Sequence, residues 1–458
     1  MKAKTILLAW LLIFALLVGS TLNNTRPYQG DESIYITSAI RMIEGGNYLV
    51  PEYFGNMRFQ KPILPYWVTV AGYRIFGIHL WSGRSLFLLI SCMTLMLVYH
   101  FSKLLSDDLE FSLMNVFLLS SSTLFFEFSR VSMTDLLLTF FMTASLFFFC
   151  RALQDPASLK RNYMIAYGSM GCGFMSKGFL GTIPVFAMLI YLLIMRPGNY
   201  KKHLKNLFSP INLLIFSLIV LPWYTFVFLN YSRLASKQLL AESSQLLPDA
   251  TSIIGNTAFY AKILVTNYFP VTTIAVIMLF KRRIRFPGVF GLPLAYMILL
   301  MAVLVFSMKL NKSRYLLTMF PTLTLFAGYT LHRSNMTTTM RNVSIAVLCL
   351  HVGFFQFYSS ISGEPVKELV MYWNENENGD LALFGLDNKR MSWAQALSNG
   401  KLMDYNDGIK YLIVPEKELG GFTGYEVIAD RDRIKKLYIE DFKFTKEKRN
   451  FYLLKRLE

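Results

Sequence analysis

The sequence predicts a polytopic all-α membrane protein with a small α/β domain after its last membrane span. Of its 458 residues, 54% are hydrophobic and only 16% are charged, which is too apolar for an ordinary soluble domain. Apolar runs of about 17 to 25 residues, long enough to cross a bilayer core, recur along the first part of the chain. Lys and Arg gather in short loops between these runs, as is typical of cytoplasmic loops.

We expect about eleven membrane helices of this kind. The first apolar segment resembles a signal peptide. Its length and the lack of a clear small-residue cleavage pattern favour an uncleaved helix with Lys2 and Lys4 in the cytoplasm. The predicted spans are 5–22, 83–102, 112–128, 132–150, 162–176, 178–195, 211–229, 263–280, 288–307, 314–331 and 342–360.

Alternation from a cytoplasmic N-terminus assigns the basic loops "RPGNYKKHLKNLFSP" and "KRRIRFP" to the cytoplasm. The opposite side then receives a long first loop at 23–82, a second long loop at 230–262 and everything after about residue 361. The sequence therefore predicts a transmembrane domain over 1–361 and a small external domain over 362–458.

The first loop and the C-terminal region both show regular patterns. "ESIYITSAIRMIEGG" and "LPYWVTVAGYRIFG" are amphipathic, and such helices can lie along the membrane surface as external juxtamembrane helices. After residue 362 the apolar runs shorten to strand length in "DLALFGL", "IKYLIVP", "EVIA" and "NFYLLKRL". These runs predict the strands of the α/β domain.

Several classes of function are disfavoured. The net charge of +17 does not indicate nucleic acid as a partner, because the basic residues cluster in short loops between spans. The four cysteines fall inside predicted spans, and the five histidines show no metal-ligand spacing. The sequence has no phosphate-binding loop of the nucleotide-hydrolysing type.

A set of ionisable residues lies near the ends of predicted spans, where charges are costly and are functional candidates. By the predicted topology they share the external membrane surface. They are Asp31, Glu32, Arg58, Lys61, Arg84, Arg130, Asp135, Lys177, Lys309, Lys312 and Arg314, with Tyr315 beside them.

Cations at this level can bind a phosphate whose lipid tail lies in the membrane, and they stabilise phosphate as a leaving group. A nearby carboxylate can orient an acceptor or take its proton. Structural explanations stay open beside this one. Lys177 and Lys309 can snorkel to the headgroups, Glu32 can favour a helix N-terminus, and Asp31 and Asp135 can cap helices.

These stretches together resemble a known family. "RFQKPILPYWVTVAGYRIFG", "RVSMTDLLLTFF", "GFMSKGFLG", "LPWY" and "KSRYLLTMFPTLTLFAG" follow an Asp-Glu pair in the order seen in integral-membrane GT-C glycosyltransferases. The subgroup that it is most similar to contains the bacterial lipid A aminoarabinose transferases and the dolichyl-phosphate-mannose protein mannosyltransferases. The resemblance covers roughly residues 25 to 330.

The resemblance implies a fold, a location and an activity. It implies inverting transfer of a sugar from an undecaprenyl-phosphate or other polyprenyl-phosphate carrier, at the periplasmic face of the inner membrane. The implied acceptor is lipid A, another envelope glycan or a protein. Membrane lipids are the other implied partners. No cofactor is certain. A divalent metal between the acidic residues stays open, although their spacing does not require one.

The resemblance also implies roles for particular residues. Asp31 matches the family's essential acidic residue, and Asp135 matches the acidic residue of its "M-T-D" stretch. Lys61 matches the lysine that contacts the carrier phosphate, and Tyr315 matches the tyrosine that approaches it. We assign Asp31, Asp135 and Glu32 as candidate catalytic residues. The candidate ligands of the donor phosphate are Lys61, Arg58, Arg84, Arg314 and Tyr315.

Two positions depart from the family pattern. Ile34 stands where many members have Arg, and Gln60 replaces a Glu that precedes the lysine. Ile34 is therefore expected to mark a substrate preference of this protein. The alternative functions are a transporter or flippase of lipid-linked sugars, and an inactive scaffold with a periplasmic binding domain.

Overall fold

The computed structural model describes residues 2–23, 31–243, 250–306, 312–361, 365–377, 379–384, 394, 398, 402–403, 409–422, 425–431, 436–440, 443–447 and 451–457. The chain divides into two compact units, each built from several segments. The helical unit comprises Met1–Gly19, Met57–Pro65 and Phe87–His351. The second unit comprises Ser20–Asn56, Tyr66–Leu86 and Val352–Glu458. The predicted domain boundary at residue 361 stays a prediction.

Apolar helices dominate the described chain, so the protein is a multi-pass membrane protein. By length and composition, six described segments could cross a bilayer: Leu80–Ser106, Thr134–Gln154, Leu159–Met195, Tyr200–Ala241, Gly288–Phe306 and Thr337–Gln356. A bent pair of helices makes a seventh candidate, and Lys4–Gly19 and Leu109–Ser120 are shorter apolar helices. The finer count of about eleven spans stays a prediction.

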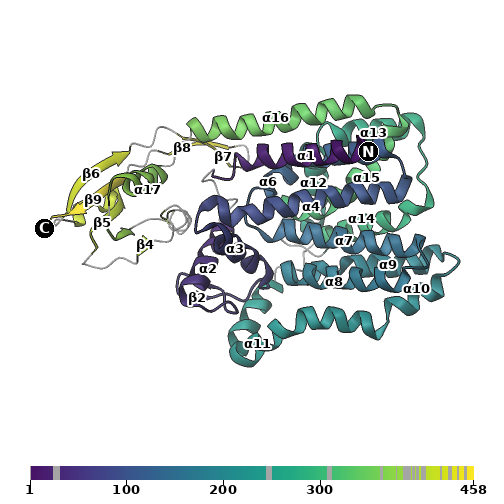
Figure 1. Cartoon of the computed structure of the whole chain (residues 1–458), viewed down its shortest axis with the longest axis horizontal. Coiled ribbons are helices and arrows are strands. Elements are labelled where there is room, and N and C mark those ends of the chain that lie inside the picture. The colour runs from purple at the N-terminus through teal and green to yellow at the C-terminus, as the bar shows by residue number, and fades with distance from the viewer. Residues whose placement is uncertain are drawn as a thin grey trace. The chain divides into compact units, whose positions relative to one another are not determined.

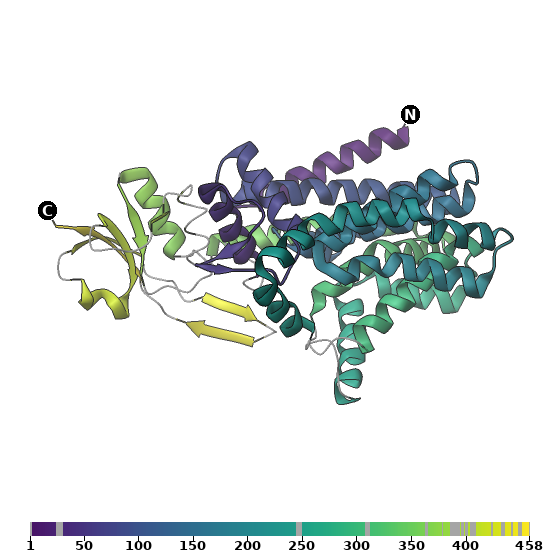
Figure 2. The same cartoon turned by 90° about the horizontal axis from the view of Figure 1, so that it is seen from below.

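The helices of the helical unit pack around α7 (Figures 1 and 2). Helix α7 (Thr134–Gln154) packs against α8 (Leu159–Lys177), α9 (Ile183–Met195), α14 (Gly291–Phe306) and α15 (Phe320–Arg333). Apolar side chains lie all around α7, as expected of a helix enclosed by other helices. The remaining helices that lie wholly or partly in this unit are α1 (Lys2–Gly19), α4 (Leu80–Ser106), α5 (Leu109–Ser120), α6 (Thr123–Phe128), α10 (Tyr200–Leu207), α11 (Pro210–Ser243), α12 (Ala250–Thr266), α13 (Val271–Arg282) and α16 (Thr337–Ile361).

Two expectations about the middle of the chain are corrected. The predicted external loop at 230–262 is largely helical, because α11 continues to Ser243 and α12 starts at Ala250. The predicted span 263–280 is broken, and its two halves meet at an angle of 96°. Pro270 explains the break, because proline has no N–H to donate and disfavours helical backbone at the residue before it.

The first loop contains both predicted helices. These are α2 (Asp31–Gly45) and α3 (Leu64–Phe76), with the short strands β1 (Glu52–Tyr53) and β2 (Asn56–Met57) between them. Helix α2 stops at Gly46, whose φ of 69° is readily adopted only by glycine.

The C-terminal part of the second unit has the predicted α/β character. Its five-stranded mixed sheet has the order β4-β3-β5-β9-β6 and contacts α17 (Pro365–Asn376). Val366, Leu369 and Trp373 of α17 share an apolar core with Leu381 and Ile413 of the sheet. The strands are β3 (Leu381–Leu383), β4 (Leu402–Met403), β5 (Tyr411–Pro415), β6 (Tyr425–Arg431) and β9 (Phe451–Arg456), and β7 (Lys436–Glu440) pairs separately with β8 (Lys443–Glu447).

Candidate active site

Asp135 is a buried carboxylate in the first turn of α7. Its side chain is only 1% exposed, and its carboxylate forms an ion pair with Lys177. Thr134 Oγ1 donates a hydrogen bond to Asp135 Oδ2 at 3.3 Å. Met133 occupies the N-cap position of α7, so Asp135 does not cap this helix. A buried charge in a membrane protein is costly unless it is paired, and Lys177 is that partner.

Lys177 is the last residue of α8 and was not among the predicted site residues. Helix α8 stops there because Gly178 adopts a φ of 71°. Gly181 then packs so closely on Gly173 that a Cβ at position 181 would overlap the α8 backbone. The close contact between these two glycines fixes the turn after α8 and keeps Lys177 at the end of the helix. Its Nζ lies 4.1 Å from the centroid of the Tyr315 ring.

A short 3₁₀ helix, η3 (Ser313–Met319), packs against α7 and brings a second group of side chains. Arg314 is 5% exposed, and its Cζ lies 5.9 Å from the centroid of the Tyr315 ring. The Tyr315 ring therefore contacts two cations, an arrangement that cation–π attraction favours. Lys312 immediately precedes η3, and Lys309 lies outside the described residues.

Lys61 joins this group from the segment that precedes α3. Burial lowers its pKa to about 7, and the positive charges of Lys177, Arg314 and Lys312 act in the same direction. The carboxylate of Asp135 opposes them. The structure thus places Lys61 within the electrostatic influence of Asp135, Lys177, Lys312 and Arg314. We call these five residues and Tyr315 the cation cluster.

Gln238 of α11 holds the segment that carries Lys61. Its side-chain amide accepts a hydrogen bond from Phe59 N at 2.6 Å and donates one to Met57 O at 2.9 Å. The Phe59 ring packs against Tyr231, with centroids 5.2 Å apart. Gln238 thus contacts the backbone of a segment about 180 residues earlier, and no sequence motif pointed to it.

The cation cluster suits an anionic ligand. The cluster contains four cations and one carboxylate, and Lys177, Arg314 and Asp135 are buried. An anionic ligand is attracted to such a group of cations, most strongly where water is excluded. Phosphate is well matched, since Lys provides point charges and Arg a fork of donors.

Two other predicted cations are less closely connected to this cluster. Arg58 lies three residues before Lys61, but it is not among the charges with the largest effects on the Lys61 pKa. Arg130 is 3% exposed and lies in the turn before α7. Among the residues that the structure describes, no three His, Cys, Asp or Glu side chains gather as metal ligands do.

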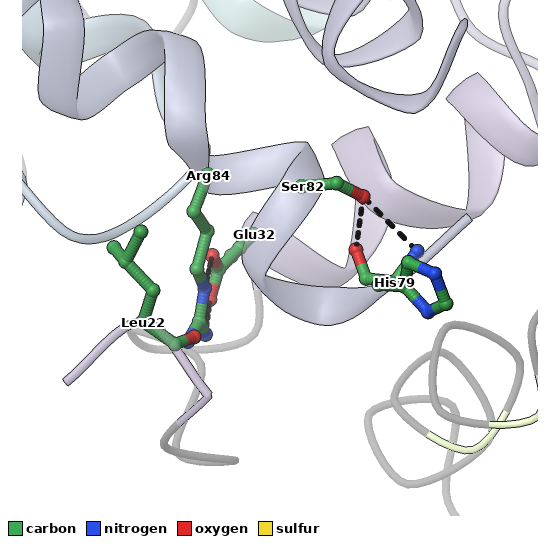
Figure 3. Close-up of polar contacts among 5 residues, drawn as sticks. All are labelled: Leu22, Glu32, His79, Ser82 and Arg84. Atoms are coloured by element: carbon green, nitrogen blue, oxygen red, sulfur yellow. Dashed lines mark hydrogen bonds and ion pairs between the residues drawn. The ribbon is translucent and has the colours of Figure 1, made fainter. Parts of the chain in front are cut away.

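The second unit contains a different buried ion pair, between Glu32 and Arg84 (Figure 3). Arg84 Nε and Nη2 donate to the two carboxylate oxygens of Glu32 at 2.7 Å each, and Nη1 donates to Leu22 O at 2.7 Å. Both side chains are fully buried. Ser82 Oγ accepts from His79 N and donates to His79 O, which fixes the start of α4 four residues before Arg84.

This arrangement bears on two predicted roles. All three nitrogen atoms of Arg84 donate within the protein, and both carboxylate oxygens of Glu32 accept from Arg84. The catalytic role of Glu32 and the phosphate-binding role of Arg84 stay predictions. Burial and the nearby Glu32 carboxylate raise the pKa of the Tyr73 phenol, so Tyr73 stays neutral beside them.

Asp31 is the first residue of α2 in the second unit and is partly exposed. Its neighbour Glu32 is anchored by Arg84, so the start of α2 is held in one orientation. Asp31 and Glu32 both lie in the first helical turn, where the helix dipole favours negative charge. The catalytic role of Asp31 stays a prediction.

Comparison with known families supports the resemblance seen in the motifs. The profile of the family described as "Dolichyl-phosphate-mannose-protein mannosyltransferase" matches residues 60–224. The protein named undecaprenyl phosphate-alpha-4-amino-4-deoxy-L-arabinose arabinosyl transferase from Pectobacterium carotovorum is 29% identical over 220 residues. This stretch covers 46% of the present chain and 38% of that relative. The protein of the same name from Edwardsiella ictaluri is 30% identical over 203 residues, covering 43% of this chain and 35% of the relative. The matches thus span well under half the length of these relatives.

Solved structures extend the similarity to nearly the whole fold. ArnT from Cupriavidus metallidurans in the apo state aligns with a TM-score of 0.71 over 97% of this chain and 98% of that chain, at 13% identity. The structure of the same protein bound to undecaprenyl phosphate gives a TM-score of 0.69 at 15% identity, with the same coverage of both chains. These likenesses establish the fold. The predicted resemblance to GT-C glycosyltransferases of the aminoarabinose transferase and protein mannosyltransferase type is confirmed.

Proposed function

We propose that this protein transfers a sugar from a polyprenyl-phosphate carrier, in bacteria undecaprenyl phosphate, to a cell-envelope acceptor such as lipid A. The observation that carries this proposal is the cation cluster, where Lys177 pairs with Asp135 and the charges of Lys312 and Arg314 act on Lys61. The named relatives use an undecaprenyl-phosphate sugar, and one similar structure holds undecaprenyl phosphate. A phosphate with a long apolar tail is the ligand that suits a cation-rich site at the ends of membrane helices.

The donor phosphate is held by Lys61, Arg314 and Lys177 in this proposal. As the bond between the sugar C1 and the phosphate oxygen breaks, negative charge grows on the phosphate, and the fixed cations stabilise it. Tyr315 lies against Lys177 and Arg314 and limits where their charges can lie. Arg58 is retained as a further candidate ligand of the phosphate because it is close to Lys61 in the chain.

The acceptor attacks C1 from the face opposite the leaving phosphate, which inverts the anomeric configuration. Asp135 is the carboxylate in the cation cluster that can orient an acceptor or take its proton. Asp31 is proposed as the second acidic residue of the reaction on the strength of the family resemblance. If the acceptor is a lipid phosphate, it is already ionised, and the carboxylates orient it without removing a proton.

The proposal includes a location and a finer topology. The site and the C-terminal domain face the periplasm, and the helices lie in the inner membrane with about eleven crossings. The contacts of α10 support this finer count. Helix α9 ends at Met195, and α10 follows at once and bonds to Tyr163 near the start of α8. Helices α8 and α9 therefore run in opposite directions, which supports two membrane crossings in the segment 159–195.

The decisive experiment is mass spectrometry of lipid A, other envelope glycans and glycoproteins from a deletion strain. One sugar is expected to disappear and to return with the wild-type gene but not with Lys61→Ala or Asp135→Asn. Both variants must insert and accumulate to the wild-type level. If every glycan and glycoprotein of the deletion strain keeps its sugar, the proposed reaction is wrong. The class that changes identifies the acceptor, and addition of a chelator tests the metal requirement.

A transporter of lipid-linked sugars is the alternative with a different class of function. The same anion-binding cluster would serve it. Purified protein in liposomes separates the two, with labelled donor and acceptor supplied on one side. Labelled product indicates a transferase, whereas movement of the label across the bilayer without product indicates a transporter.

A further inference from the structure

The opposite end of the helical unit carries a basic surface built by α8 and α10. Tyr163 OH and His203 Nδ1 lie 3.2 Å apart within hydrogen-bond distance, and Tyr167 OH donates to Leu207 O. The second pair lies four residues after the first on both helices. Helix α10 therefore runs parallel to the first turns of α8, with both helices starting at the same end (Figure 1).

This packing gathers cations from three segments. Lys160 and Arg161 belong to the first turn of α8, and Arg196 ends α9. On α10, His203 and Leu207 are buried, while the three lysines are exposed. The name basic surface is used here for six exposed residues, which are Lys160, Arg161, Arg196, Lys201, Lys202 and Lys205.

Little negative charge opposes these cations. The sequence has no Asp or Glu from residue 196 to residue 209. The acidic residue nearest to Lys160 in sequence is Asp155, whose carboxylate accepts hydrogen bonds from the backbone N–H groups of Ala157 and Ser158 at 3.2 and 3.3 Å. The basic surface is therefore strongly positive.

The position of the basic surface points to lipid headgroups. Helix α8 has 19 residues, from Leu159 beside the basic surface to Lys177, and is about 28 Å long. A bilayer core is about 30 Å thick, so when the cation cluster lies at one membrane face, the basic surface lies at the other. Ile194, Met195 and Phe208 are large apolar side chains exposed beside these cations. Apolar and cationic side chains thus adjoin, as they do at the boundary between acyl chains and headgroups.

We propose that the basic surface binds the headgroups of anionic phospholipids and thereby stabilises the packing of α10 on α8. This goes beyond the attraction that any basic loop has for a membrane, because the cations come from three segments held together by buried tyrosine contacts. The inference is independent of the reaction proposed above.

The experiment measures lipid binding to the purified full-length protein in detergent, by native mass spectrometry, with phosphatidylglycerol and phosphatidylcholine as probes. Each cation near an anionic surface contributes about a fivefold factor in affinity. Replacing Lys201, Lys202 and Lys205 together by Gln is expected to weaken phosphatidylglycerol binding at least tenfold and to leave phosphatidylcholine binding unchanged.

The matched control replaces Lys281, Arg282 and Arg283 by Gln. These residues are also exposed and basic, at the end of α13, and the net charge changes by the same amount. The control is expected to lose clearly less phosphatidylglycerol binding than the α10 variant, because its cations come from one segment and do not adjoin those of α8 and α9. If the α10 variant does not fold, Lys160→Gln with Arg161→Gln takes its place, against Arg282→Gln with Arg283→Gln.

Three results would overturn the inference. One is a wild-type protein that binds both lipids equally well. Another is an equal loss, or no loss, in the α10 variant and its control. The third is displacement of the lipid by soluble polyphosphate at equal charge concentration, which would make the basic surface a general polyanion site.

Discussion

Lys61 can change its charge near neutral pH, because burial and three neighbouring cations lower its pKa to about 7. Below this pH the ammonium is charged and attracts a phosphodiester, which keeps its own negative charge throughout the neutral range. Donor affinity is therefore expected to be constant below pH 7 and to fall above it, by up to about tenfold per pH unit. Binding of a donor analogue, followed from about pH 5.5 to 8.5, measures this.

Lys61→Arg is the control for this pH dependence. Arginine stays protonated throughout the range, so the variant is expected to bind the analogue with little change across it. A fall of equal steepness in Lys61→Arg would assign the titration to another group.

Asp135→Asn separates catalysis from donor binding. Loss of a carboxylate that orients or deprotonates the acceptor is expected to reduce turnover by about 10² to 10⁴-fold. The four cations remain, so donor affinity is expected to stay the same or to increase. Turnover and donor affinity are measured separately with purified protein. Asp155→Asn, at the far end of α7, is the control and should retain both. Loss of donor binding in Asp135→Asn would instead indicate a structural role.

The residue types of the site could be read from the sequence, but their pairs could not. Asp135, Lys61, Arg314 and Tyr315 were predicted and lie in the cation cluster. For Lys177 the sequence leaves snorkelling to the headgroups open, because its partner Asp135 is 42 residues earlier in the chain. The pairing of Glu32 with Arg84, 52 residues apart, is hidden in the sequence for the same reason.

At the scale of elements, Gln238 of α11 is expected to control the position of Lys61. Gln238→Leu keeps a similar volume but removes both hydrogen bonds to the segment before Lys61. Each such bond contributes about 1 kcal/mol, so loss of both is expected to lower donor affinity by up to about thirtyfold. The measurement is binding of the donor analogue.

Asn230→Leu is the matched control, because Asn230 lies on the same helix and its side chain bonds to Phe226 O within it. An equal loss in both variants would mean that α11 is destabilised as a whole. Unchanged affinity in Gln238→Leu would show that Lys61 is positioned by other contacts.

The elements themselves were largely predictable. Long apolar runs predict the helices, and short apolar runs predict the C-terminal strands. Errors arose where one signal hid another. The apolar run at 263–280 concealed the break before Val271, and the polar composition after residue 230 concealed the continuation of α11. Tertiary contacts, such as those of Gln238, stabilise helix in that polar stretch.

At the scale of the whole molecule, the remaining question is its orientation in the membrane. From the positive-inside pattern we expect the basic surface in the cytoplasm, and the length of α8 then predicts the cation cluster on the periplasmic side. Met57, near the cation cluster in the chain, and Asn199, next to the basic surface, are both exposed. A single cysteine at each position therefore reports which face is accessible.

Met57→Cys is expected to react with a membrane-impermeant maleimide once the outer membrane is opened. Asn199→Cys is expected to react only after the inner membrane is also permeabilised. Cys349 is the exposed native cysteine among Cys92, Cys150, Cys172 and Cys349, so Cys349→Ser provides the background. The reverse labelling order would place the cation cluster in the cytoplasm. A carrier-linked sugar presented in the periplasm could not reach it there, and transfer to a periplasmic acceptor would be ruled out.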